Sequence, residues 1–362
     1  MHKSPAPIGT HYLDIETPAL LVDMALMERN LERTAAFFAT ATAKLRPHVK
    51  THRSPHLAHL QMAAGAFGMS CGNLAEAELM IDGGIDDVLV TKEIVQPSQI
   101  ARVAELAQRS SIKVIVDDPD IVRLTGEIAR ANGATIEVLV DVDLRLGRSG
   151  VQPGEPARAL AHLVANTPGL RFVGLMGYEG SMHPFTSAER DQACRDALAK
   201  LMATSELIER DGLPVPIRSC GATSTYHVAA NYPGITEVQP GSYMLSDAKY
   251  RKIMPDVPCA LSVLVSVVSR PSAGRVTVDA GQKALYSDGG LPVPTREGLS
   301  VVALNEEHGQ LDWDGSGDAI RVGDRLSLIP WHAGTTINLY DFMYGIRDQC
   351  VAAIWPVFAR SE

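Results

Sequence analysis

The sequence predicts an α/β protein: a (β/α)8 TIM barrel with a second, C-terminal all-β domain that includes the N-terminal strand. Two patterns support this. Between about residues 44 and 243, short apolar runs alternate with segments of helical periodicity, and after about residue 247 short segments rich in valine and isoleucine are separated by turns. The first pattern is typical of βαβ units and the second of all-β domains. We therefore expect the barrel at residues 24–246 and the β domain at residues 1–23 and 247–362.

Eight apolar runs predict the strands of the barrel. They are Leu45–Val49, Phe67–Cys71, Asp87–Val90, Ile112–Val116, Ile136–Val142, Phe172–Met176, Ile217–Cys220 and Ile235–Val238. The intervening helices are predicted at Leu74–Asp82, Pro97–Gln108, Pro119–Ala131, Glu155–Ala165 and Ser187–Asp211. Eight strands in series favour a closed barrel. A doubly wound open sheet is the alternative, and the absence of a glycine-rich dinucleotide turn after the first strand weakens it.

The β domain is predicted from runs that are short and rich in β-branched residues. They are Leu261–Ser269, Arg275–Asp279, Leu299–Leu304, Arg325–Ile329, Thr336–Leu339 and Cys350–Phe358. Pro18–Asp23, with its Leu-Leu-Val core, is predicted as a strand that precedes the barrel and joins this domain.

Composition narrows the class of partner. Net charge is −9 with acids and bases interleaved, which argues against a nucleic-acid or anionic-membrane surface. No apolar run reaches the length of a membrane span, and the first residues lack the apolar core of a signal peptide, so we expect a cytoplasmic protein. The five cysteines form no CxxC pair, which makes a disulfide framework or cysteine zinc site an unfavourable interpretation.

Lys50 follows the first predicted strand, where the carboxyl ends of barrel strands hold the active site. A lysine that loses part of its hydration there, or lies near another cation, becomes a nucleophile toward carbonyls. A solvated basic turn is the alternative for this residue taken alone. The histidines His48 and His52 flank Lys50 and could tune its pKa or contact a substrate carboxylate.

Other strand ends carry residues that would complete such a site. Arg148 follows the fifth strand between glycines and could reach an anionic oxygen, and Tyr178 follows the sixth and could stack on a flat ligand; His183 lies beyond it. The seventh strand ends in small and hydroxylated residues that suit a phosphate cradle, and the eighth ends in a second small-residue turn. These two turns are Gly221-Ala222-Thr223-Ser224-Thr225 and Gln239-Pro240-Gly241-Ser242-Tyr243. Each motif alone also fits a surface or structural role, but together they predict one site.

At this point the sequence resembles a family. Arg46–His52 is similar to the pyridoxal phosphate lysine motif of the D-threonine aldolase and D-serine dehydratase group, relatives of alanine racemase with fold type III. The resemblance continues over nearly the whole chain. It includes Ala63–Ala66, Ala75–Glu78, Gly147–Val151, Gly177–Gly180, Gly241–Tyr243, Asp279–Leu285 and Asn338–Asp341.

The resemblance implies a pyridoxal 5'-phosphate cofactor and a homodimer. Lys50 would form the Schiff base, Arg148 would contact the phenolic oxygen of the ring and Tyr178 would line the cofactor. The residues expected to hold the phosphate are Gly221, Ala222, Thr223, Ser224, Gly241, Ser242 and Tyr243. Gln239 would lie near the pyridine nitrogen, where a neutral partner would leave the ring a poorer electron sink.

The sequence departs from the family at its metal site. The aldolase and dehydratase branch binds a divalent metal through a His-x-Asp or His-x-Cys pair, whereas here His332 is followed two residues later by Gly334. One imidazole is a poor site for a hard cation. Either Asp341 or Glu179 supplies the missing oxygen, or the chemistry needs no metal, or His332 acts without a metal as a general base; we favour the last. A purely structural His332, packed on Trp331, is the remaining alternative.

The resemblance implies an amino acid as substrate. The leading hypothesis is retro-aldol cleavage of a 3-hydroxy-D-amino acid to glycine and an aldehyde, with Lys50, His332 and His52 as candidate catalytic residues. The alternatives are β-elimination by a dehydratase, racemisation, and a non-catalytic pyridoxal phosphate-binding protein. The complete β domain argues for an enzyme, because the small carrier homologues of this barrel lack one.

Overall fold

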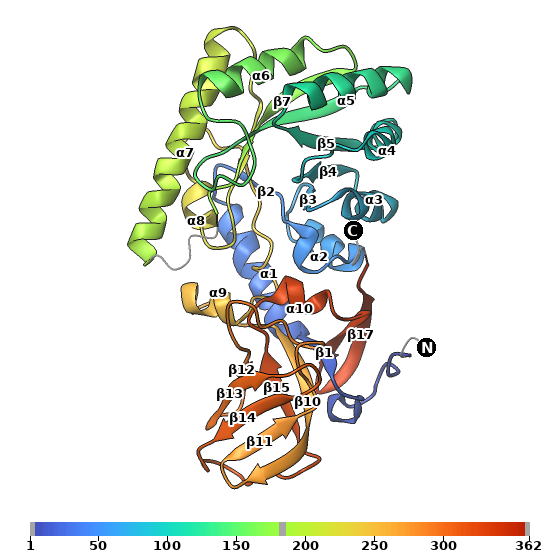
Figure 1. The fold of residues 1–362 in the computed structure, drawn as a ribbon, viewed down its shortest axis with the longest axis vertical. Coiled ribbons are helices and arrows are strands. Elements are labelled where there is room, and N and C mark those ends of the chain that lie inside the picture. The colour runs from blue at the N-terminus through green and yellow to red at the C-terminus, as the bar shows by residue number, and fades with distance from the viewer. Residues whose placement is uncertain (1–3, 181–185, 359–362) are drawn as a thin grey trace. The chain divides into compact units, whose positions relative to one another are not determined.

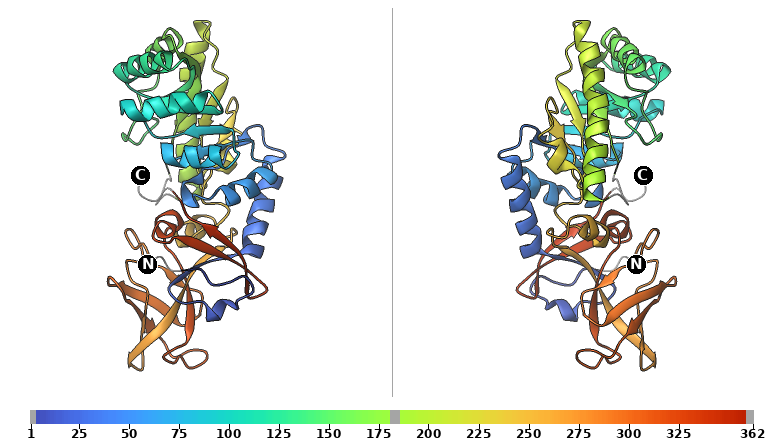
Figure 2. Two further views of the ribbon diagram at one scale, coloured as in Figure 1. Left: turned by 90° about the vertical axis from the view of Figure 1, so that its right-hand side faces the viewer. Right: turned by 90° about the vertical axis from the view of Figure 1, so that its left-hand side faces the viewer.

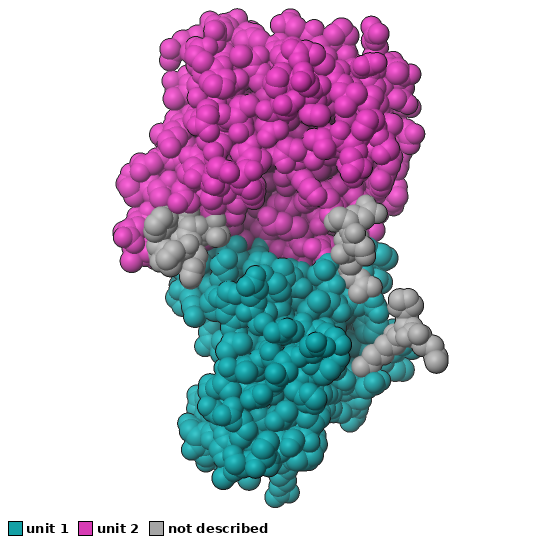
Figure 3. All heavy atoms as spheres, viewed as in Figure 1, with its two compact units in different colours: residues 1–33, 242–360 teal, residues 34–241, 361–362 magenta. Residues whose placement is uncertain are grey.

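The structure is a computed structural model that describes residues 4–180 and 186–358. The chain divides into two compact units (Figure 3): residues 34–241 form one, and residues up to 33 together with 242–360 form the other. Within the described ranges, no helix combines the length and the apolar character that a membrane crossing requires.

The unit of residues 34–241 contains eight parallel strands in the order β2-β9-β8-β7-β6-β5-β4-β3. They are β2 (Lys44–Leu45), β3 (Met69–Cys71), β4 (Asp87–Val90), β5 (Ser111–Val116), β6 (Ile136–Val142), β7 (Leu170–Gly177), β8 (Ile217–Cys220) and β9 (Glu237–Val238). The sheet closes between its first and last members, because Phe67 N donates to Leu45 O at 3.2 Å and Ser70 N donates to Pro47 O at 2.8 Å. The predicted (β/α)8 barrel is confirmed.

Helices cover the outer side of these strands (Figures 1 and 2). They are α1 (Met24–Phe38), which begins in the other unit, α2 (Pro55–Ala63), α3 (Leu74–Asp82), α4 (Pro97–Ala107), α5 (Pro119–Ala131), α6 (Glu155–Ala165), α7 (Ser187–Arg210) and α8 (Tyr226–Ala229). Their starts follow from the sequence: Asn73 and Asp118 cap α3 and α5 through their side chains, and Thr186 with Glu189 forms a capping box at α7.

The first strand is shorter than predicted. The run Leu45–Val49 was expected to be a strand, but β2 ends at Leu45 and residues Val49–Thr51 form one turn of 3-10 helix. Pro47 has no N–H to donate to a ladder, and the His48 side chain caps the turn by accepting a hydrogen bond from Lys50 N. Lys50, expected directly after the strand, therefore lies in the middle of a compact turn.

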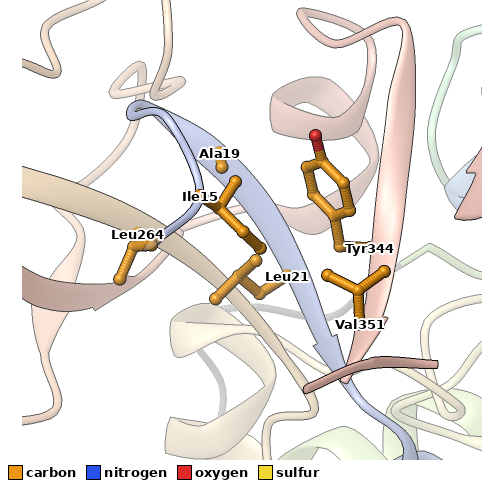
Figure 4. Packing of buried hydrophobic residues seen from close by; sticks show 6 residues of the cluster. All are labelled: Ile15, Ala19, Leu21, Leu264, Tyr344 and Val351. Atoms are coloured by element: carbon orange, nitrogen blue, oxygen red, sulfur yellow. The ribbon is translucent and has the colours of Figure 1, made fainter. Parts of the chain in front are cut away.

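The second unit is mainly β, with the strand order β13-β14-β11-β10-β1-β16-β17 and with β15 joining β10 to β12. Its strands are β1 (Ala19–Asp23), β10 (Leu261–Ser272), β11 (Arg275–Val278), β12 (Val293–Pro294), β13 (Leu299–Leu304), β14 (Gly309–Trp313), β15 (Arg325–Ile329), β16 (Phe342–Arg347) and β17 (Cys350–Pro356). The N-terminal strand β1 pairs with β10 and β16, which confirms that it belongs to this domain. Figure 4 shows the small core on one side of β1, formed by Ile15, Ala19, Leu21, Leu264, Tyr344 and Val351.

The predicted strand Thr336–Leu339 is wrong. Residues Ala333–Ile337 form the helix α10, and a second short helix, α9, spans Ala248–Ile253. Asp247 accepts a hydrogen bond from Ala333 N at 2.9 Å, and the His332 ring accepts one from Thr335 N at 3.3 Å. These caps satisfy the free N–H groups of the first turn and override the β propensity of the Thr-Thr-Ile sequence.

A chain of charges, buried at Arg46 and Lys113 and exposed at Arg171, ties the barrel together near the N-terminal ends of its strands. Arg46 is 1% exposed, and its guanidinium bonds Glu237 of β9 at 2.9 Å and Asp87 of β4 at 2.6 Å. Lys113 then bonds Asp87 at 3.0 Å and Glu137 at 3.2 Å, and Arg171 pairs with Glu137. The Arg46 pairs lie on both sides of the closure of the barrel.

The neighbours of Arg46 leave no spare space. Its guanidinium lies 4.4 Å from the centre of the Phe67 ring. A Cβ atom on Gly68 would lie 2.7 Å from Arg46 Nη1 and 2.6 Å from Asp87 O, so only glycine fits at this position. Phe67 and Gly68 therefore accommodate the guanidinium as it reaches from β2 to β4.

We expect Arg46→Met to lower the free energy of unfolding by about 3–5 kcal/mol, because it leaves the carboxylate of Glu237 buried without its partner. The matched control is Arg123→Met, which removes an exposed pair with Asp120 and should cost less than about 1 kcal/mol. Urea unfolding of both variants measures the difference. Equal losses in the two variants would contradict a special role for Arg46.

Candidate active site

Lys50 lies in the turn Val49–Thr51 at the carboxyl end of β2, and its side chain is open to solvent between two buried neighbours. Burial by the surrounding protein lowers the pKa of its amine, the charge of Arg148 lowers it further, and Glu76 partly opposes both. The side chain is thus exposed overall, while the protein around the amine desolvates its charged form. A larger fraction of it is the unprotonated nucleophile at neutral pH than for an ordinary lysine.

Three of the predicted residues come together around one aromatic ring. Lys50 Nζ lies 5.8 Å from the centre of the Tyr178 ring, and Arg148 Cζ lies 5.2 Å from it. Tyr178 follows β7, and burial together with the Glu179 charge raises the pKa of its phenol to about 12 against the effect of Arg148. Arg148, Ser149 and Tyr178 also line a small recess whose cavity volume is about 10 Å³. His183 lies outside the described residues.

The two histidines beside Lys50 bond protein groups through both ring nitrogens. His52 Nδ1 accepts a hydrogen bond from Ser54 N at 3.2 Å, so Nε2 carries the proton and donates to Gln61 Oε1 at 3.1 Å. His48 Nδ1 accepts from Lys50 N at 3.3 Å, and Nε2 lies 3.0 Å from Thr91 Oγ1. These bonds suit histidines that hold the Lys50 turn in place more than histidines that contact a substrate.

Glu76 is a buried glutamate near Lys50 that the sequence analysis did not identify as part of the site. Its carboxylate accepts a hydrogen bond from Gly72 N at 2.6 Å and pairs with Arg53 Nε at 3.2 Å. Burial raises the pKa of Glu76, against the N–H of Gly72 and the charges of Arg53 and Lys50. The sequence gave only a weak indication that Glu76 is buried, because a glutamate near the start of α3 is also common in an exposed first turn of a helix.

The turn Gly221–Thr225 follows β8, as expected for a phosphate cradle, but two of its N–H groups point inward. Gly221 N donates to Glu179 Oε2 at 3.1 Å, and Ala222 N donates to Thr225 Oγ1 at 3.0 Å. The Thr225 hydroxyl donates in turn to Glu179. The expectation that the N–H groups of this whole turn face outward is wrong for Gly221 and Ala222. The sequence pattern gave no sign that the buried Glu179 occupies them.

The second turn packs against the first and against the Lys50 turn. Gly241 N donates to Thr223 Oγ1 at 3.1 Å, and a Cβ atom on Gly241 would lie 3.0 Å from His48 O. The amide of Gln239 donates to Ser219 Oγ at 2.6 Å. Thr223, Ser224, Ser242 and Tyr243 are all buried, and Ser242 and Tyr243 follow Gly241 directly in the chain.

His332 lies in the β unit and caps α10. Its Nδ1 lies 3.0 Å from Thr335 Oγ1, and its ring meets the Tyr286 ring with centres 6.3 Å apart. Trp331 contacts Lys252 and the backbone at Gly290. His332 thus engages α10 through its Nδ1.

The described residues contain no group of three His, Cys, Asp or Glu side chains arranged to hold a metal ion. Gly334 has no donor atom, and one of the two substitutes considered, Glu179, uses its oxygens on Gly221 and Thr225. The pair His332 and Gly334 therefore does not fit the two-residue metal site of the resembled branch.

Comparison with known proteins covers both units. Residues 22–248 match the family model "Alanine racemase, N-terminal domain", and residues 260–346 match "Putative serine dehydratase domain". Three curated relatives align over most of the chain. D-threonine aldolase of an Arthrobacter species is 35% identical over 98% of this chain and 96% of its own, and 3-hydroxy-D-aspartate aldolase of Paracoccus denitrificans is 33% identical over 99% and 95%. D-threo-3-hydroxyaspartate dehydratase of a Delftia species is 31% identical over 90% and 92%.

A solved structure agrees with the sequence comparison. The crystal structure of D-threonine aldolase from Filomicrobium marinum superimposes with a TM-score of 0.95 at 38% identity, covering 99% of both chains. The chain therefore belongs to the D-threonine aldolase and D-serine dehydratase-like family of pyridoxal phosphate enzymes, which has the alanine racemase-like barrel.

Proposed function

We propose that this enzyme is a pyridoxal phosphate-dependent lyase that cleaves a 3-hydroxy-D-amino acid to glycine and an aldehyde by a retro-aldol reaction. The observation that carries the proposal is the likeness to two aldolases, at 35% and 33% identity, over almost the entire chain. The accessible, desolvated amine of Lys50 supplies the group that such a cofactor needs.

The described residues fit the cofactor. Lys50 would hold its aldehyde carbon, and Arg148, whose guanidinium lies over Tyr178, would bind the phenolic oxygen. We propose that the phosphate site is formed by Thr223, Ser224 and Gly241, together with Gly221, Ala222, Ser242 and Tyr243. In this proposal Gly221 and Ala222 act by shaping the turn, since their N–H groups are engaged with Glu179 and Thr225. Gln239 is proposed to lie near the pyridine nitrogen.

The residues of the chain divide the remaining work. When bound, pyridoxal phosphate supplies a conjugated ring that takes up the electron pair released at Cα. Lys50 holds and releases the cofactor, and His332 takes the proton from the β-hydroxyl while the Cα–Cβ bond breaks and the aldehyde C=O forms. A proton returned to Cα completes glycine. His52 keeps the Lys50 turn in place through its hydrogen bonds with Ser54 N and Gln61.

A dehydratase is the second candidate, because D-threo-3-hydroxyaspartate dehydratase is 31% identical over 90% of this chain. That reaction would remove water from the same class of substrate and give ammonia and a keto acid. The products separate the two: an aldehyde with glycine for the aldolase, a keto acid with ammonia for the dehydratase.

The proposal also includes the assembly and the surroundings of the enzyme. We propose that it is a cytoplasmic homodimer acting on a small amino acid, with residues 24–246 as the cofactor-binding barrel and residues 1–23 and 247–362 as the β domain. The pairing of β1 with β10 supports the inclusion of the N-terminal strand in the β domain.

We expect the purified protein to be yellow, and to release glycine and an aldehyde from one or more of D-threonine, D-phenylserine and 3-hydroxy-D-aspartate. Borohydride should fix the cofactor to Lys50, and Lys50→Ala should lower kcat by about 10³-fold or more because the covalent step is lost. Arg123→Met, far from the site on the surface of α5, serves as the control. A colourless protein that takes up no pyridoxal phosphate would contradict the proposal.

We expect His332→Ala to lower kcat by about 10²–10⁴-fold, the usual contribution of a general base. Prolonged treatment with a chelator should leave the activity of the unaltered enzyme unchanged. His59→Gln, which changes an exposed histidine of α2, is the control for non-specific effects. If a chelator abolishes activity and manganese restores it, the role of His332 as a metal-free base is wrong.

The stability of the barrel should fall as the pH falls below about 6.5. Burial lowers the pKa of His52 from 6.5 to about 4, against the bonds from Gln61 and Ser54, so protonation favours the unfolded chain. The stability contributed by neutral His52 is present above the unfolded pKa and is lost as the pH falls towards 4, about 2 kcal/mol of it between pH 7 and pH 5. Urea unfolding should show a smaller loss over this interval for His52→Gln, and an unchanged loss for His59→Gln.

A further inference from the structure

The loop from Asp143 to Gly150 joins β6 to α6 and carries Arg148. Its residues Arg145–Arg148 are exposed, and an exposed loop of this length would ordinarily leave an arginine free to move. Here the Asp143 carboxylate accepts hydrogen bonds from three successive N–H groups of the loop: Arg145 at 3.1 Å, Leu146 at 2.9 Å and Gly147 at 3.1 Å. The segment before Arg148 is thus folded around one side chain.

Two other carboxylates hold the segment after Arg148. The Ser149 hydroxyl donates to Asp141 Oδ2 at 3.0 Å, and Gly150 N donates to Asp117 Oδ2 at 3.0 Å. The backbone itself is close-packed here, because a Cβ atom on Gly150 would lie 2.6 Å from Asp143 N. Arg148 is therefore flanked on both sides by residues anchored to strand ends.

The three acids bond the loop backbone and the Ser149 hydroxyl, Asp143 also accepts from the Gln152 amide, and none of the three pairs with the guanidinium. Asp141 also shares a hydrogen bond with Glu93, and burial together with the Glu93 charge raises the pKa of Asp141 to about 7. In the part of the chain that the structure describes, Arg148 forms no ion pair, although acids surround its loop; its guanidinium lies over the Tyr178 ring. Its charge acts on Lys50, whose pKa it lowers. The loop acids thus fix the position of a cation without neutralising it, which leaves that cation for an anionic oxygen of a ligand.

We propose that Asp143 is a positioning residue, and that with Asp141 and Asp117 it clamps the loop so that Arg148 stays over Tyr178 and beside Lys50. The part of this inference that concerns cofactor binding by Arg148 rests on the proposed function. The geometry favours Asp143 as the main member, since it binds three loop N–H groups while Asp141 and Asp117 each bind one group. The opposing hydrogen bonds outweigh burial and hold the pKa of Asp143 below its usual value, so the carboxylate stays an acceptor.

The experiment compares Asp143→Ala with Asp143→Asn, which retains an acceptor oxygen in the same place. Lys50 of the full chain, freed of cofactor, is acetylated at pH 7.5, and the rate at Lys50 is followed by mass spectrometry. Losing the nearby charge of Arg148 leaves more of the amine protonated, so Asp143→Ala should slow acetylation about three- to tenfold. Asp143→Asn should react at nearly the rate of the unaltered protein. Arg148→Gln removes the charge altogether, so its acetylation rate gives the largest slowing that loss of Arg148 can cause.

The matched control is Asp118→Ala. Asp118 also accepts two backbone N–H bonds, from Asp120 and Ile121, but it caps α5 and does not touch the Arg148 loop. It should leave the rate at Lys50 unchanged. If Asp143→Ala fails to fold, Ser149→Ala, which removes only the bond to Asp141, should slow acetylation in the same direction by a smaller factor.

Acetylation at the unaltered rate in the folded Asp143→Ala protein, or in Ser149→Ala where that is the variant used, would overturn the proposal. So would an equal loss in Asp143→Asn, because the acceptor oxygen would then be irrelevant. A second readout is the affinity of the cofactor-free chain for pyridoxal phosphate, which should weaken in Asp143→Ala and recover in Asp143→Asn. Because acetylation needs no cofactor, it still tests the clamp if the protein proves to bind no pyridoxal phosphate.

Discussion

The buried guanidinium of Arg46 is the constraint on which the barrel and its site depend. Removing a charge of this size from water is costly, and only close partners with good geometry offset the cost. Glu237 and Asp87 provide them at 2.9 Å and 2.6 Å, from strands on either side of the closure. The strands cannot slide past one another without breaking these bonds. Pro47 and His48 follow Arg46 directly and continue the hydrogen bonding of the barrel, through Ser70 N to Pro47 O and through His48 N to Pro240 O, so the Lys50 turn begins beside a strand end that Arg46 holds.

The two ends of the barrel treat charge in opposite ways. At the N-terminal end, Arg46, Lys113 and Arg171 are all paired with carboxylates. At the other end, within the described ranges, Lys50 and Arg148 share the Tyr178 ring and neither forms an ion pair. Two like charges held close together destabilise the fold, and a stability argument alone would not place them there. Such an arrangement is characteristic of functional sites, where a ligand supplies the missing negative charge.

The sequence was sufficient where local and tertiary preferences agree. The strands Asp87–Val90 and Ile136–Val142 and the helix Leu74–Asp82 were predicted to the residue, because buried apolar runs and a side-chain cap at Asn73 define them. The Thr336–Leu339 prediction failed because these residues end a helix that His332 caps and that Asp247, far away in the sequence, anchors by accepting a hydrogen bond from Ala333 N. Tertiary partners of this kind leave no mark on a local pattern.

The same distinction applies to the site. Lys50, Arg148 and Tyr178 could be predicted from their places at the strand ends of a barrel, and the structure brings all three together. The residues that hold them could not, because Glu76, Glu179 and Asp143 act through backbone N–H groups whose direction the sequence does not reveal. The family match indicated the cofactor, while Gly334 shows that the match does not extend to the metal pair.

The dipeptide Tyr178-Glu179 connects the two halves of the proposed cofactor site. Side chains that alternate along an extended segment point to opposite sides, and here the tyrosine reaches the cations while the glutamate reaches the turn after β8. Burial raises the pKa of Glu179 despite the bonds that it accepts from Gly221 N and the Thr225 hydroxyl. Two neighbouring residues thus join the pair of cations to the turn that is proposed to hold the phosphate.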